Sequence, residues 1–211
     1  MKTLIAVAEP DPNSEFEQRR MRRINEVFSR VERALNGEPA ARMTLDEEAT
    51  VVDFKARNLQ GAVDRLKPWV LQYPLESYSL WNDSELKEKV VWVHHVFGCA
   101  LSYLGRLDES EAAFQSIIDN VPEEENPGGV ARALVWRGHV LNKEGRLIDA
   151  IESFEQGLAV DAVNTPLDLP GDFDQPSVKG SQMGRRLRSD FVDIYEQAKI
   201  RYTVNGGGAA Q

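Results

Sequence analysis

The chain has 211 residues, of which 42% are hydrophobic and 28% are charged, and its formal net charge is −9. This composition excludes a disordered chain, and the acidic balance disfavours nonspecific adhesion to nucleic acid or to an anionic membrane. Cys99 is the single cysteine, which excludes an intramolecular disulfide, and we expect a cytoplasmic setting. The apolar run 4–8 is shorter than the core of about 7 to 15 residues that a secretion signal needs.

A first helix is predicted near the start of the chain. Residues 13–14 can cap it, and an apolar stripe at helical spacing runs from Ile24 to Leu35. Gly37 is expected to end this helix, because glycine is common just past a helix terminus.

A second helix is predicted from Thr44 to about Arg57. Thr44 and Glu47 have the spacing of a capping box, in which each side chain satisfies a backbone N–H at the helix start. A partner helix follows from Leu59. Pro68 lacks an N–H and crowds the preceding turn, so we expect the partner helix to kink or end there.

Helices continue through the rest of the chain. Asp83, or a neighbour, can cap a long apolar helix that reaches Leu104. The remaining predicted helices span residues 108–120, 129–144, 147–160 and 184–202. Alternation typical of strands is nearly absent from the sequence, so the predicted fold class is all-α.

One stretch of the sequence occurs twice. LGRLDESEAAF at 104–114 is followed forty residues later by EGRLIDAIESF at 144–154. A glycine precedes each bend by seven residues, and a phenylalanine follows each bend by nine. We expect the first glycine to let two helices approach closely, the second to form the bend, and the phenylalanine to fill the space between helices. The matched positions are Gly98 with Gly138, Gly105 with Gly145, Leu107 with Leu147 and Phe114 with Phe154.

A weaker copy lies 48 residues upstream, where Leu59, Ala62, Leu66 and Pro74 match Leu107, Ser110, Phe114 and Pro122. With these residues the chain resembles a tetratricopeptide repeat (TPR) protein from Thr44 to Asp161. His94 and Leu134 stand where that family usually has tryptophan, and the spacings of 48 and 40 require insertions at 75–83 and 123–128. The resemblance implies stacked antiparallel helical hairpins in a TPR-like superhelix, with flanking N- and C-terminal helices.

Five parts are therefore expected along the chain. They are an N-terminal segment with a flanking helix at 1–43, three TPR-like hairpins at 44–161, a Pro- and Asp-rich connection at 162–182, a capping helix at 183–203 and a flexible tail at 204–211. The connection is either a disordered link or a segment that lies across the groove, anchored by Leu169 and Phe173. The capping helix has an apolar stripe from Leu187 to Tyr202, which we expect to cover the last hairpin.

The resemblance implies a function without chemistry, namely a scaffold or adaptor that binds a protein or peptide segment in a groove lined by the first helix of each hairpin. No cofactor is expected. The groove candidates are Glu47, Val51, Phe54, Trp92, His95, Cys99, Ser102, Arg132, Val135, His139 and Asn142. Two alternatives stay open: Trp92, Cys99 and Val135 are core residues, or the chain is a permanent subunit of a larger assembly.

An alternative of another class is a metal-dependent enzyme that uses His94, His95 and Cys99. His95 and Cys99 share a helical face, but two ligands fall short of the three or four that zinc sites need. Basic runs at 19–23 and 179–188 suggest phosphate contacts. Glu15, Glu17 and Glu26 lie three or four residues from the arginines of the first run, which favours a solvated, salt-bridged face over a protein contact or a nucleic-acid site.

Overall fold

The computed structural model describes residues 15–164 and residue 200, and within these residues every regular element is a helix. The helices are α1 (Glu15–Leu35), α2 (Pro39–Lys55), α3 (Leu59–Gln72), the 3-10 helix η1 (Leu75–Leu80), α4 (Ser84–Tyr103), α5 (Leu107–Asn120), α6 (Pro127–Glu144) and α7 (Leu147–Asn164). The all-α prediction is confirmed. No helix in this part of the chain is long and apolar enough to cross a membrane.

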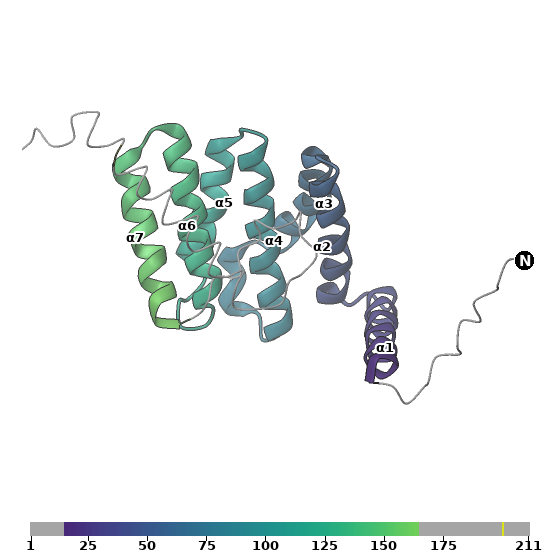
Figure 1. The fold of residues 1–211 in the computed structure, drawn as a ribbon. Coiled ribbons are helices and arrows are strands. Elements are labelled where there is room, and N and C mark those ends of the chain that lie inside the picture. The colour runs from purple at the N-terminus through teal and green to yellow at the C-terminus, as the bar shows by residue number, and fades with distance from the viewer. Residues whose placement is uncertain (1–14, 165–199, 201–211) are drawn as a thin grey trace, which may run out of the picture.

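Three helical hairpins stand side by side in chain order: α2 with α3, α4 with α5, and α6 with α7 (Figure 1). The first helices contact one another, α2 with α4 and α4 with α6, and we call them the first-helix layer. Each second helix packs against the first helix of the next hairpin, α3 on α4 and α5 on α6. At the α2 end of the stack, α1 continues away from the hairpins and packs on α2 (Figure 1).

The bends inside the three hairpins share one backbone conformation. Gly105 and Gly145 have φ of 76° and 82°, so both repeat glycines form the bends as predicted. The equivalent position of the first hairpin, 48 residues before Gly105, is Arg57, whose φ is 58°. Each bend closes with the same hydrogen bond across five residues: Asn58 N to Asp53 O (2.8 Å), Arg106 N to Leu101 O (3.0 Å) and Arg146 N to Leu141 O (3.0 Å).

The other pair of repeat glycines permits close helix packing. A Cβ atom on Gly98 would lie 2.8 Å from Cζ of Phe114, and one on Gly138 would lie 2.8 Å from Cδ1 of Phe154. Both rings are buried. Ser110, where the other copies have alanine, donates its hydroxyl hydrogen to the Gly98 carbonyl at 2.8 Å. The close approach predicted from the repeat is therefore confirmed in both hairpins.

The start of α2 differs from the prediction. The helix begins at Pro39, five residues before Thr44, because proline fits the first turn, where its missing N–H is not needed. Thr44 lies inside the helix, and its hydroxyl donates to the Ala40 carbonyl at 2.9 Å. The predicted capping box is therefore wrong.

Helix α3 continues past Pro68 to Gln72, so of the two expected outcomes, a kink or an end at this proline, the end is wrong. The last turn is held by tertiary contacts. Trp69 is buried, and its indole N–H donates to Asp46 Oδ2 of α2 at 2.7 Å. Packing therefore outweighs the local cost of the proline.

The first predicted insertion is an ordered part of the core. Residues 75–80 form η1, which packs against α4 and α5. Leu75 and Tyr78 are buried, and the rings of Tyr78 and Trp81 lie 5.9 Å apart. The second insertion, at 123–128, leads into α6, where Asn126 caps the helix by accepting the Gly129 N–H at 2.9 Å.

The C-terminal predictions lie outside the described residues. Helix α7 ends at Asn164, three residues into the predicted connection. The rest of that connection, with Leu169 and Phe173, the capping helix at 183–203 and the tail at 204–211 are outside this part of the chain, as is the basic run at 179–188. Ile200 alone is described, and it is helical.

Candidate partner-binding cleft

Side chains from all three first helices meet in a cleft of about 630 Å³. Four predicted groove residues line it: Glu47 from α2, Trp92 and His95 from α4, and Arg132 from α6. The other lining residues are Tyr78, Ser84, Lys87, Glu88, Lys89, Val91, Glu125, Asn126 and Gly129. The fold thus brings together four predicted groove residues that are as many as 85 positions apart in sequence.

The cleft carries both signs of charge. Lys89 Nζ of α4 lies 2.9 Å from Glu47 Oε2 of α2, with both side chains about one quarter exposed. Lys87 Nζ lies 2.8 Å from Glu125 Oε2 in the connection before α6. These ion pairs join neighbouring elements across the cleft, so its walls are tied together by half-buried charges.

One wall of the cleft is aromatic and basic. The rings of Trp92 and His95 are stacked with centroids 6.0 Å apart, and the Arg132 guanidinium lies 5.9 Å from the centre of the Trp92 ring. Burial, and then the nearby Arg132 charge, lower the pKa of His95 to about 3, so its imidazole is neutral at physiological pH. Within the described part of the chain, His95 Nδ1 and Trp92 Nε1 are buried without a hydrogen-bond partner.

Several predicted groove residues lie in the core. Cys99, Val135 and Ser102 are buried. The alternative that Trp92, Cys99 and Val135 are core residues is therefore correct for Cys99 and Val135, whereas Trp92 is half-buried and lines the cleft. Cys99 Sγ lies 3.6 Å from His95 Nε2. Burial raises the pKa of the Cys99 thiol well above its usual value, so this thiol stays protonated.

Farther along the first-helix layer, two residues that the sequence analysis missed join the helices. Lys143 Nζ of α6 donates to Ser102 Oγ of α4 at 2.9 Å and lies 5.6 Å from the centre of the Tyr103 ring. Tyr103 in turn packs edge-on against Phe54 of α2, which is buried, with ring centroids 6.1 Å apart. The forty-residue offset pairs Tyr103 with Lys143, and this match could have identified both.

The remaining predicted groove residues, Val51, His139 and Asn142, are half-buried. The ring of His139 packs against Trp136 and Phe154, at centroid distances of 5.4 Å each. Burial lowers the pKa of His139 to about 4, with a smaller contribution from the Lys143 charge. Neither His95 nor His139 is therefore a cation at neutral pH.

The two adjacent histidines of α4 have different surroundings. His94 Nε2 lies 3.0 Å from the Tyr73 carbonyl oxygen at the end of α3, whereas His95 lies beside Cys99. Among residues 15–164, no three histidine, cysteine or acidic side chains come close enough together to hold a metal ion. His94, His95 and Cys99 thus do not form a shared ligand set.

The basic run on α1 is partly compensated, as the sequence analysis expected. Arg19 pairs with Glu15 one turn earlier on the same helix. Farther along α1, Arg30 pairs with Glu48 of α2. The first contact neutralises part of the run, and the second fixes one side of α1 to α2.

Comparisons with protein-family models, with curated proteins and with solved structures gave no match for this chain. The functional argument therefore depends on the cleft itself.

Proposed function

We propose that this chain is a TPR-like interaction module that binds an extended segment of a protein partner along the first-helix layer, with the cleft as its principal contact. The observation that supports this most is the meeting of Glu47, Trp92 and Arg132, one residue from each of three consecutive first helices, in one half-open cleft. Its volume of about 630 Å³ is in the range of ligand-binding sites.

The cleft walls favour a peptide as the ligand. Tryptophan and arginine are the side chains that most often dominate binding energy at protein interfaces, and Trp92 and Arg132 stack in the same wall. The paired charges of Glu47 with Lys89 and of Lys87 with Glu125 offer both acceptors and donors to a peptide backbone. We therefore expect a partner segment that inserts one side chain beside Trp92 and forms polar contacts on either side of it.

The proposal is tested by selecting peptides from a displayed random library on the purified chain. Enriched peptides should bind in isolation, and Trp92→Ala should weaken the binding by about tenfold or more, the loss typical of an interface hot spot. Arg132→Ala should weaken the same peptides. Fluorescence anisotropy of labelled peptides measures both effects.

Arg106→Ala is the matched control, because Arg106 pairs with Glu109 on the exposed bend after α4 and does not line the cleft. It should leave peptide affinity unchanged. Enriched peptides that bind equally well to the Trp92 and Arg132 variants would place the binding surface elsewhere. A library that yields no binder above background would count against the proposal as a whole.

A further inference from the structure

Helix α1 exposes a continuous apolar face. The side chains of Phe28 and Leu35 are 70% and 83% exposed, and those of Met21 and Val27 are 51% and 52% exposed. At 100° per residue Met21, Phe28 and Leu35 lie within about 40° of one another on one side of the helix, and Val27 lies at the flank of that face. Apolar faces of this kind mark surfaces that bind a protein or a membrane.

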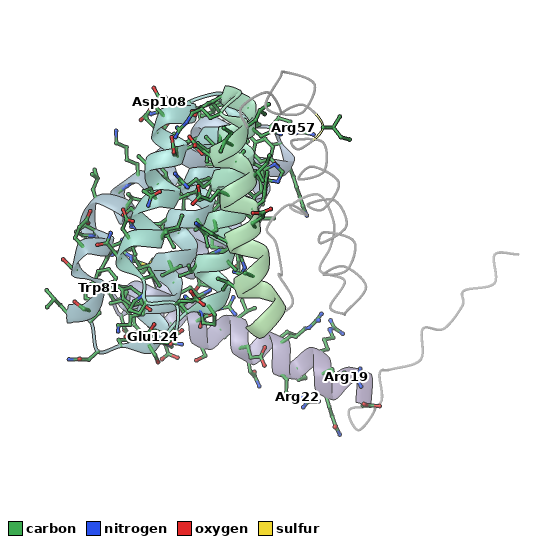
Figure 2. All side chains as sticks on the ribbon, turned by 90° about the vertical axis from the view of Figure 1, so that its left-hand side faces the viewer. Arg19, Arg22, Arg57, Trp81, Asp108 and Glu124 are labelled. Carbon is green, nitrogen blue, oxygen red and sulfur yellow. The ribbon has the colours of Figure 1, made fainter. Side chains whose placement is uncertain are left out.

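The hairpins hold α1 by another side. Ala34 is buried, and Arg30 and Arg33 reach Glu48 and Glu38 of the neighbouring segments. By helical spacing, Arg30 lies nearly opposite Phe28. Figure 2 shows α1 extending beyond the helix stack, with Arg19 and Arg22 near its outer end. The centre of the apolar face, at Phe28 and Leu35, is therefore turned away from the side of the helix that carries Arg30.

The charge of α1 is opposite to that of the remaining chain. The helix has six arginines and four glutamates, a formal charge of +2, which leaves −11 for the rest of a chain whose total is −9. Arg20 and Arg22 are exposed. A strongly polar, arginine-rich face combined with a phenylalanine- and leucine-bearing apolar face is typical of helices that lie in a membrane interface.

We propose that α1 binds the surface of an anionic lipid bilayer, with its axis parallel to the surface and its apolar face among the headgroups. Phe28 and Leu35 enter the interface, while Arg20, at the N-terminal end of the face, contacts lipid phosphates or carboxylates. The acidic remainder opposes this only weakly, because charges farther than about 8 Å from the surface are screened at physiological ionic strength. The site is separate from the cleft and does not depend on the function proposed for it.

Two protein occupants fit the face less well. If α1 paired with α1 of a second copy, the stripe from Met21 to Leu35 would supply about two heptads, which is short for a stable helix pair in water. The amphipathic segment 183–203 of this chain has five arginines and lysines and three acidic residues, so its formal charge is also +2. The two segments carry charge of the same sign, which disfavours that pairing, whereas an anionic surface attracts α1.

The test is co-sedimentation of the full chain with phosphatidylcholine vesicles, with and without about one third phosphatidylserine. The chain should bind the phosphatidylserine vesicles and lose affinity as salt is raised. Phe28→Ser should lower the partition coefficient by about tenfold or more, because one large apolar side chain no longer enters the interface. Arg20→Glu should lower it by about fivefold or more.

Leu71→Ser is the matched control, since Leu71 is also 70% exposed but lies on α3. It should leave vesicle binding unchanged, and circular dichroism should show equal helix content in all variants. The proposal is overturned if the chain does not sediment with either vesicle, or if Phe28→Ser and Leu71→Ser bind alike. A dimer in solution that Phe28→Ser dissociates would also overturn it, because α1 would then bind a second copy.

Discussion

Replacing Gly138 by valine tests the packing that the repeat encodes. A Cβ atom on Gly138 would lie 2.8 Å from Cδ1, 2.9 Å from Cε1 and 3.0 Å from Cγ of Phe154. Unbonded carbon atoms prefer about 3.5 to 4.0 Å, and the ring is buried at 1% exposure with little room to move. The two valine methyl groups extend the clash beyond Cβ.

We expect Gly138→Val to lower the free energy of unfolding by about 3 kcal/mol, the upper end of the usual cost of overpacking. For a domain of roughly 150 to 250 residues, 1 kcal/mol changes Tm by about 2 to 4 °C, so Tm should fall by about 6 to 12 °C. Thermal unfolding followed by circular dichroism measures this change. A double-mutant cycle with Phe154→Ala should give a combined loss smaller than the sum, because removing the ring removes the clash.

Gly128→Val is the control on the same helix. A Cβ atom there would meet only Arg132 Nη2, at 3.7 Å, which is an ordinary contact. Its Tm should stay close to that of the parent chain. An unchanged Tm for Gly138→Val would refute the reasoning, because Phe154 would then have space that the structure does not contain.

Three further predictions follow from other described residues. Arg57→Gly should raise the free energy of unfolding in urea by about 1 kcal/mol, because a non-glycine residue at φ 58° is strained. Gly145→Ala, at φ 82°, should lower it by a similar amount. A loss of stability in Arg57→Gly, or a gain in Gly145→Ala, would contradict this. Stability should fall as pH drops below about 6.5, because burial lowers the pKa of His95 to about 3 and that of His139 to about 4, so the unfolded chain binds more protons in this range. In urea titrations at several pH values, His95→Gln should reduce the change in the free energy of unfolding with pH. An unchanged pH dependence in this variant would show that other groups cause it. Purified protein should contain no stoichiometric zinc by atomic absorption, and one equivalent that disappears in Cys99→Ala would reverse this prediction.

The helices and bends were predictable because their signals are local. Asp83 accepts the backbone N–H groups of Glu85 and Leu86 at the start of α4, as its position before an apolar helix predicts. Gly105 and Gly145 form the bends that their spacing indicated. A helix start or bend involves only residues within a turn or two, and their sequence contains that information.

Other features follow from contacts between distant segments. The sequence does not reveal that Pro68 stays inside α3, because the bond from Trp69 to Asp46 joins residues 23 positions apart. The ordered η1 was missed for a similar reason, since residues 75–80 have no helical periodicity of their own and Leu75 and Tyr78 are buried by other helices.

The candidate site also combines features that the sequence predicts with features that depend on tertiary packing. Helical spacing by itself determined that Trp92, Cys99 and Arg132 belong to the first helices of successive hairpins, because a repeat fixes equivalent positions. Only the tertiary structure decided that Cys99 is buried while Trp92 and Arg132 line an open cleft. The physical reason is that spacing gives the direction of a side chain from its own helix, whereas its exposure depends on what neighbouring helices place in front of it. The ion pair of Glu47 with Lys89, 42 positions apart, exists for the same reason only once the hairpins have stacked.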